Sequence, residues 1–335
     1  MTPKAWTYIL NRYINGGYFS SAEGVAASVT PGLMYYKNAG AVMSMFERRK
    51  EEMERGESQE LNIPFYEGKN EFVWEMIEAL KPLSAYIHSA YIHGSLATGE
   101  EIPYSDFDAL IVFRDSLFEN RSKLSRTASA INGLRYYMHR QDPIQHHGWF
   151  ALSEIDLLDY HEDFLPVATL KKAKRIFPLE KEGLVLFVNP VVDFKKPLYR
   201  LCKSIERKLV NGPDKYNLYS LKAILSEFMM LPSLYVQARD KKGIFKKESF
   251  NEMRIDFTPE DFSVMDLVSS IRSKWKIELS EKEKQFLERT DFYAWYRRKH
   301  IGYKIPSRLK DAVDDELFIR MRLLTVEARK KIEQG

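Results

Sequence analysis

The sequence has almost none of the residues that crosslink a chain or anchor it in a membrane. Its single cysteine, Cys202, excludes disulfides within the chain and zinc sites built from several cysteines. No stretch approaches the ~20 apolar residues of a membrane span. Residues 1–12 also lack the basic segment and apolar run of a secretory signal. We therefore expect a cytoplasmic protein with no membrane partner.

Net charge is also low. The 335 residues carry a formal charge of +4, and the pI is near 8.8. A balance this weak does not by itself indicate nucleic acid, and we expect none as a partner. It suits a small anionic ligand such as a nucleoside triphosphate. Hydrophobic residues make up 44% of the chain, which is enough for a folded core.

The chain divides into three segments by the texture of its sequence. Residues 1–67 predict an N-terminal extension with one helix, residues 68–195 a catalytic domain of helices and strands, and residues 196–335 a helical C-terminal domain. Apolar periodicity and Pro/Gly punctuation give the elements. The predicted helices cover 33–55, 71–80, 122–139, 199–210, 218–239, 259–275, 281–300 and 311–333, and the predicted strands cover 85–93, 107–113 and 143–152.

Two carboxylates stand one residue apart in the most informative segment. Asp106 and Asp108 flank Phe107 at the start of an apolar run that ends at Phe113. Alternate side chains of a strand share a face, so both carboxylates project together. Two carboxylates in an apolar strand are costly unless cations neutralise them, which two Mg²⁺ ions about 4 Å apart would do. We therefore expect Asp106 and Asp108 to bind metal and to be catalytic.

A glycine–serine pair precedes these carboxylates by a short turn. Gly94 allows the backbone to approach a phosphate closely, and Ser95 adds an amide N–H and a hydroxyl. A helical turn beginning near residue 96 would add free N–H groups that favour an anion. A phosphate cradle would then face the metal carboxylates, an arrangement suited to in-line transfer at phosphorus.

This combination resembles a known signature. Gly94-Ser95, a spacer of about ten residues, and Asp106-Phe107-Asp108 followed by apolar residues are similar to the DNA polymerase beta-like nucleotidyltransferase superfamily, particularly its small bacterial branch of aminoglycoside and minimal nucleotidyltransferases. The resemblance implies an α+β fold, in which a mixed sheet is flanked by helices. It also implies a nucleoside triphosphate donor held by Gly94 and Ser95, and two Mg²⁺ ions held by Asp106 and Asp108.

The expected third carboxylate is missing from this pattern. Family members usually carry it on a later strand, as a metal ligand and as a base, but the middle of 143–152 reads Gln145-His146-His147-Gly148. Asp142 could reach the site from the strand edge, or a histidine could replace the acid as base. In a regular strand the two histidines face opposite sides, and we favour His147 as the inward one. A third alternative is that activity is lost and only binding remains.

Cations for the triphosphate are expected on a later helix. Arg200, Lys203 and Arg207 recur at spacings of three and four, which places them on one helical stripe. We assign Lys203 and Arg207 to nucleotide binding. Lys246 and Lys247 follow Gly243 in a stretch that reads as a loop, and we favour them less.

The leading hypothesis is a Mg²⁺-dependent enzyme that transfers a nucleoside monophosphate from a triphosphate, such as ATP, to a hydroxyl. The acceptor is a small molecule or a protein side chain, and pyrophosphate leaves. The alternative is an inactive, antitoxin-like module that binds a nucleotide or a partner. The sequence leaves open the acceptor, the nucleobase and the oligomeric state, a homodimer being one alternative.

Overall fold

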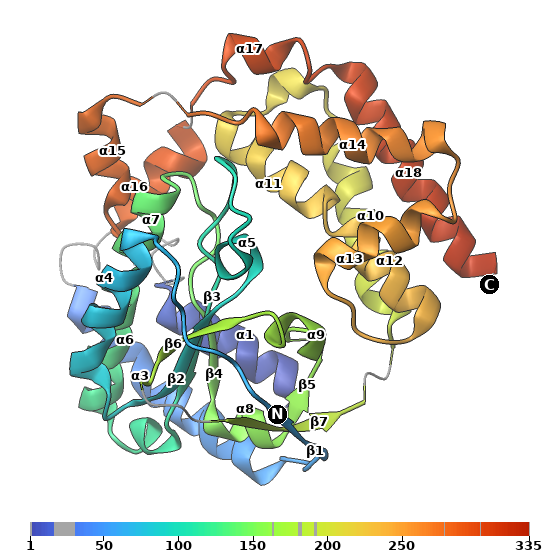
Figure 1. The fold of residues 1–335 in the computed structure, drawn as a ribbon. Helices are drawn as coiled ribbons and strands as arrows, with labels where there is room; N and C mark the ends of the chain where they lie inside the picture. Colours follow the sequence, from blue (N-terminus) through green and yellow to red (C-terminus); the bar gives the residue numbers. More distant parts are fainter. Residues whose placement is uncertain are drawn as a thin grey trace.

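The computed structural model describes residues 2–16, 31–162, 164–179, 183–190, 193–277, 279–301 and 303–334. Within these ranges the fold is α+β, as predicted, with mixed sheets in one part and a large group of helices in the other (Figure 1). None of the described helices combines the length and the apolar character needed to cross a bilayer.

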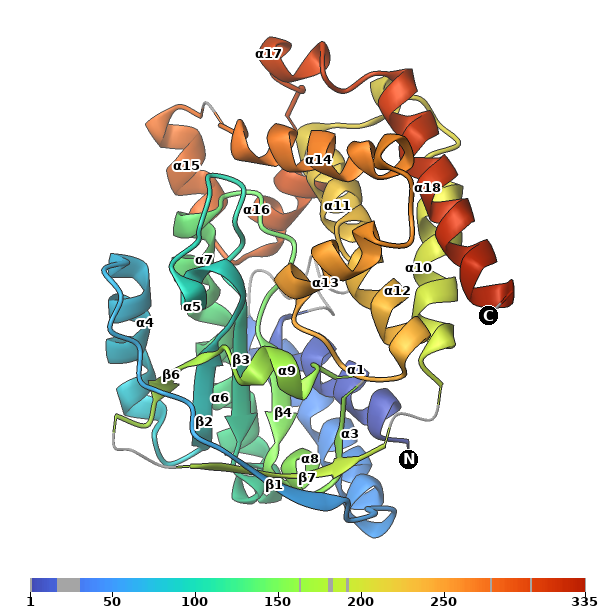
Figure 2. The same ribbon diagram turned by 45° about the vertical axis from the view of Figure 1, so that its right-hand side comes forward.

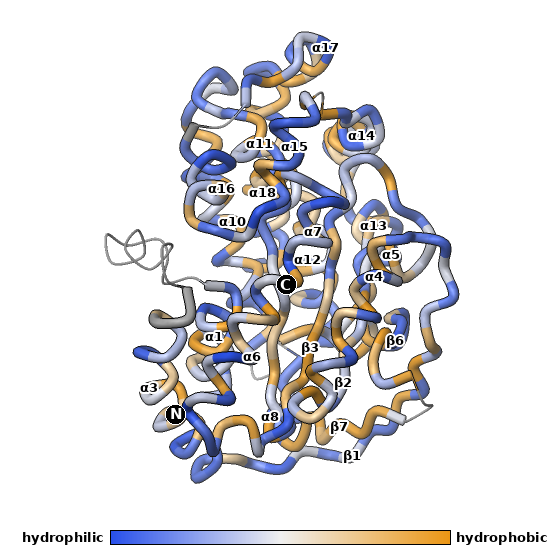
Figure 3. The backbone as a smooth tube through the Cα atoms, turned by 90° about the vertical axis from the view of Figure 1, so that its left-hand side faces the viewer, coloured by the Kyte–Doolittle hydropathy of each residue, from blue (hydrophilic) through white to orange (hydrophobic). Residues whose placement is uncertain are grey.

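The larger sheet contains the strands that bracket the motif, in the order β4-β3-β2-β6. Strand β2 (Ile87–Ile92) pairs antiparallel with β3 (Ala109–Phe113) and β6 (Lys174–Phe177), whereas β4 (Phe150–Ser153) pairs parallel with β3. All residues of β3 are buried, so the strand is covered on both faces. The tube of Figure 3 shows its hydrophobic character.

The smaller sheet joins distant parts of the chain. Strand β7 (Leu184–Asn189) pairs antiparallel with β1 (Glu57–Leu61) and parallel with the short β5 (Tyr160–His161). Strand β1 lies in a stretch for which no strand was expected. Its pairing with β7 ties residues before the predicted catalytic domain to the end of that domain.

Helices of the first 140 residues share one hydrophobic core with the larger sheet. These are α1 (Pro3–Ile14), α3 (Pro31–Glu51), α4 (Glu71–Leu80), α6 (Arg121–Gly133) and α7 (Arg135–Gln141). The segment predicted as an N-terminal extension is thus packed into the core of the sheet region.

Helix α1 also covers the edge of the sheet. Asn11 and Asn15, four residues apart, lie about 6 Å apart along the helix, close to the ~6.6 Å between alternate strand residues. The Asn11 side chain donates to Ala151 O at 2.9 Å and accepts Ala151 N–H at 2.8 Å. Asn15 makes the same pair of bonds with Trp149, at 2.7 and 2.8 Å. Two side-chain amides therefore satisfy backbone groups that an open edge strand would expose.

The C-terminal helices form a second hydrophobic core, and Figure 2 shows them beside the larger sheet. They are α10 (Lys195–Lys208), α11 (Leu218–Phe228), α12 (Leu231–Asp240), α13 (Lys246–Arg254), α14 (Pro259–Ser273), α15 (Glu281–Glu288), α16 (Phe292–Tyr296), α17 (Ser307–Lys310) and α18 (Asp315–Gln334). Tyr104, from the segment between β2 and β3, belongs to this second core, so the two parts are interlocked.

Several predicted elements are divided or shortened. The predicted helix 218–239 splits into α11 and α12 because Pro232 lies in the first turn of α12, where its missing N–H costs nothing. The predicted helix 281–300 is divided into α15 and α16, since Asp291 caps the start of α16, and a π-helical turn continues over Arg297–Ile301. The predicted strand 143–152 is wrong over its first seven residues, which lie outside any strand.

The edge clamp gives a direct test of stability. We expect Asn11→Ala to lower the free energy of unfolding by about 1–3 kcal/mol, because Ala151 loses both hydrogen-bond partners. Asn38→Ala is the matched control, since that amide donates to the Met34 carbonyl of its own helix. Urea unfolding of both variants measures the difference. Equal losses would contradict the clamp.

Candidate functional site

A glycine and an aspartate meet where β2 and β3 separate. The His93 N–H donates to Asp108 O at 3.0 Å, which extends the ladder one residue beyond β2. The next residue, Gly94, has φ of 69°, and a Cβ there would lie 2.7 Å from Asp108 Oδ2. Only glycine fits, because the position combines left-handed backbone with a carboxylate against it.

Gly94 also begins the short helix α5 (Gly94–Thr98), two residues before the helical turn that the sequence suggested near residue 96. His93 provides no side-chain cap for it. The Ser95 hydroxyl donates to Ser105 Oγ at 2.9 Å, and Ser105 Oγ accepts the Ile102 N–H at 3.0 Å. These bonds fold the chain between Gly94 and Asp106 back beside the glycine–serine pair.

The strand predicted over 107–113 begins only at Ala109 in the structure, so Asp106 and Asp108 both precede β3. They still flank the fully buried Phe107, and both line one cavity together with Gly94 and Ser95. The four residues on which the sequence hypothesis rests are therefore brought together.

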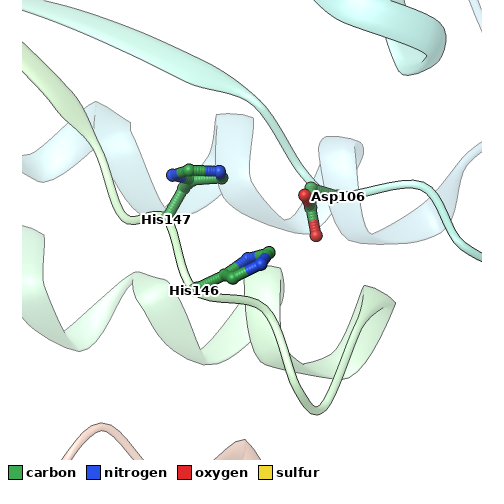
Figure 4. Close-up of side chains that lie close together, drawn as sticks. All are labelled: Asp106, His146 and His147. Carbon is green, nitrogen blue, oxygen red and sulfur yellow. The ribbon is translucent and has the colours of Figure 1, made fainter. Parts of the chain in front are cut away.

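The irregular segment after α7 is attached to this point by one side chain. Gln145, 1% exposed, accepts the Phe107 N–H at 2.7 Å and donates to Phe107 O at 3.1 Å and to His147 O at 3.0 Å. A side-chain amide thus replaces the strand pairing that the sequence predicted. The alternation of faces no longer applies, and both histidines lie on the side of Asp106 (Figure 4).

The two histidines and Asp106 form a cluster of metal-type donors. One donor atom from each of Asp106, His146 and His147 lies within 4.8 Å of the others. Neither ring nitrogen of His146 has a hydrogen-bond partner among the described residues, although both are shielded from solvent. Burial lowers the pKa of His146 to about 4, so the ring is neutral at pH 7 and free to coordinate.

Asp142 lies next to Asp106, on the side of it that faces away from the cavity. Lys222 of α11 is fully buried, and its Nζ lies 2.7 Å from Asp106 Oδ1 and 2.5 Å from Asp142 Oδ2. Burial raises the pKa of Asp142 to about 7. Burial is also the largest single influence on Asp106, but Lys222 and the other neighbouring groups together outweigh it and lower that pKa. Asp142 lines neither cavity described below, so it does not provide the open carboxylate that the sequence suggested.

The cavity that contains the four motif residues has a volume of about 1070 Å³ and lies between the larger sheet and the C-terminal helices. Its cations are Lys246 and Lys247 at the start of α13, and Arg272 of α14. Burial lowers the pKa of Lys246 to about 8, while Asp108 and Asp106 oppose that shift from across the cavity. Lys203 and Arg207 are exposed on α10 and do not line the cavity, so the structure does not support their assignment to nucleotide binding.

Residues 73–211 match the family described as nucleotidyltransferase domain. This segment is a nucleotidyltransferase domain. The match is consistent with the polymerase beta-like superfamily, and it confirms the family resemblance of the Gly94-Ser95 and Asp106-Phe107-Asp108 motif. No curated protein and no solved structure matches the chain.

The nucleotidyltransferase domain ends before three residues that complete the surroundings of its motif. Lys222, Lys246 and Arg272 all come from helices beyond residue 211. Sequence reasoning missed Lys222 and Arg272 because each is one basic residue in an ordinary amphipathic helix. It ranked Lys246 below Lys203 and Arg207 because the start of α13 was read as a loop.

The contact between Gly94 and Asp108 predicts how two glycines differ. Gly99 also has φ of 69°, but nothing lies within 4 Å of a Cβ there. We expect Gly99→Ala to cost about 1–2 kcal/mol of unfolding free energy from backbone strain alone. Gly94→Ala should cost at least about 1 kcal/mol more, because Asp108 must move. Denaturant unfolding checks the order, and equal losses would disprove the contact.

The neutral, buried His146 predicts a pH dependence. An unfolded histidine titrates near pH 6.5, so between ~6.5 and ~4 the unfolded chain binds a proton that the folded chain rejects. The free energy of unfolding should therefore fall as the pH falls through this window. His146→Gln should flatten the fall by on the order of 2 kcal/mol. Denaturant unfolding with chelator, from pH 4.5 to 7.5, measures it.

The control for this pH series is His300→Gln, which removes an exposed histidine. It should keep the wild-type slope. A wild-type slope in His146→Gln would show that the ring is not held neutral.

Proposed function

We propose that this chain transfers a nucleoside monophosphate from a nucleoside triphosphate to a hydroxyl of a small molecule or protein and releases pyrophosphate. The observation that carries the proposal is the contact of Gly94 with Asp108, in one cavity with Ser95 and Asp106. The nucleotidyltransferase domain supports the reaction class. The cavity has room for a triphosphate, with ATP as the proposed donor.

The proposed triphosphate lies between two walls of the cavity. Gly94 and Ser95 form one wall, where the backbone can approach phosphate oxygens closely and the Ser95 amide N–H, in the first turn of α5, can donate. Lys246, Lys247 and Arg272 form the other. Arg272 Nε is buried and has no partner among the described residues, which suits a donor reserved for an anionic ligand.

The residues present fit a divalent cation. Asp106 and Asp108 supply the oxygen ligands that Mg²⁺ prefers, and the unpartnered ring nitrogens of His146 offer a further donor at the cluster. We propose that Asp106 and Asp108 hold two Mg²⁺ ions. The ions would neutralise charge on the phosphates and align the reacting groups.

The proposed chemistry is an in-line displacement. The acceptor oxygen forms a bond to the α-phosphorus, and the bond from that phosphorus to the bridging oxygen of the β-phosphate breaks. We propose that His147 takes the hydroxyl proton, because it is exposed and lines both cavities beside Asp108. Asp142 is a positioning residue, since its carboxylate is bound to Lys222 behind the site.

Asp108→Asn tests the proposal. Incubation with α-labelled ATP, Mg²⁺ and a cell lysate should label an acceptor and release pyrophosphate with the wild type. The variant should be slower by at least about 100-fold, because it loses a charge-neutralising ligand. Asp266→Asn is the control, because that carboxylate pairs with Arg254 on the surface and leaves the cavity untouched. Tight ATP binding without transfer would instead support a binding module.

A further inference from the structure

A second cavity of about 720 Å³ opens on the other side of the motif. It shares His93, Asp108, His146 and His147 with the first cavity. The other walls come from α1, the segment around Trp149, and the region from Thr290 to Lys299. Because the carboxylate of Asp108 is common to both, two molecules placed in the two cavities would meet at the same point.

Three cations line the second cavity. Arg135, Arg298 and Lys299 line it, and none of them forms a salt bridge with the residues that the structure describes. Arg298 is 3% exposed, and its terminal nitrogen donates to Leu287 O and Arg289 O, both at 2.7 Å. The Nε atoms of Arg298 and Arg135 are buried and have no partner in the described ranges.

The two guanidinium groups also repel each other. Burial, and then the neighbouring Arg135, lowers the pKa of Arg298 to about 9. His139 is fully buried beside both arginines, and its pKa is lowered by burial first and then by their charges. Tyr219, Asp142 and Asp291 oppose the shift of Arg298 only in part. Two like charges so close together are unfavourable, and a bound anion would offset that cost.

Acidic groups in this cavity are already engaged. Asp291 caps α16 through Ala294 N–H at 3.0 Å and pairs with Arg289. Among the residues that the structure describes, the other carboxylate on its walls is Asp108, which belongs to the proposed metal site. The walls of the cavity therefore carry an excess of positive charge, which is unfavourable for a cationic ligand.

Aromatic rings complete the walls. Tyr219, Phe292 and Trp295 line the cavity, and the Tyr219 ring lies 5.5 Å from that of His146. Lys299 Nζ lies 5.1 Å from the Trp295 ring centroid, so the ammonium and this ring lie together. Apolar faces beside fixed cations suit a small molecule with a carbon framework and an anionic group.

We propose that the second cavity binds the acceptor, and that this acceptor is a small hydroxyl compound carrying a carboxylate or a phosphate held by Arg135 and Arg298. The inference rests on the proposed function. The anion fixes one end of the acceptor at the arginines, and the hydroxyl reaches the shared wall at Asp108 and His147. A cationic sugar would meet the arginines with the wrong charge.

Calorimetric binding tests this assignment. The full chain, saturated with Mg²⁺ and α,β-methylene ATP to fill the first cavity, is titrated with glycerol 3-phosphate, glycerate, glycerol and kanamycin. We expect one or both anions to bind at least tenfold more tightly than glycerol and kanamycin, and the stronger anion separates phosphate from carboxylate. Arg298→Gln and Arg135→Gln should weaken that binding at least tenfold and leave nucleotide binding within twofold.

Two further variants keep the result interpretable. Arg297→Gln is the matched control, because this neighbour pairs with Glu283 at 2.8 Å and does not line the cavity. Lys299 is exposed, so the Lys299→Gln variant should fold normally. We expect it to weaken anion binding about threefold. Equal binding of anions and glycerol, or unchanged anion binding in the arginine variants, overturns the acceptor assignment. Failure of the nucleotide analogue to bind the wild type overturns the proposed function instead.

Discussion

Buried negative charge beside β3 is the constraint on which this structure depends. Asp142 is buried and Asp106 partly buried, and Lys222 Nζ lies within 2.7 Å of a carboxylate oxygen of each. Burial alone would lower the pKa of Lys222, but the two carboxylates raise it, so the ammonium keeps its charge. Because Lys222 belongs to α11, the C-terminal helices neutralise the domain that carries the motif. Removing this cation would leave two buried carboxylates uncompensated.

The motif could be predicted from the sequence, whereas the residues that surround it in space could not. Gly94, Ser95, Asp106 and Asp108 lie within fifteen residues, and each has a requirement that its own residue type reveals. Gly94 needs a left-handed backbone, and the carboxylates need cations. Helix α4 was predicted with its observed bounds from its amphipathic residues and from Pro82 after it, and the structure adds that Asn70 caps its start.

What could not be read depended on contacts between distant residues. The segment from Pro143 to Trp149 has the composition of a strand, but Gln145 bonds to Phe107 and takes the place of regular pairing. That one amide decides that His146 and His147 both face Asp106. The sequence likewise gives no sign of what Asn11 and Asn15 do. They bond to the sheet edge only because α1 packs against Trp149 and Ala151. Periodicity cannot report such bonds, since they follow from tertiary packing.

The wall that the two cavities share brings the charges of both into one site. On one side, Lys246, Lys247 and Arg272 surround the proposed triphosphate. On the other side Arg298 is buried and Arg135 half-buried, and neither forms a salt bridge with the described residues. Two anions brought toward one point repel each other unless positive charge lies between or around them. Asp108 alone would worsen that repulsion, so its carboxylate makes sense at this wall only with divalent cations bound. The cations on both sides and the proposed metal site are therefore one electrostatic system. Each part lowers the free energy of placing the charges of the other two near Asp108.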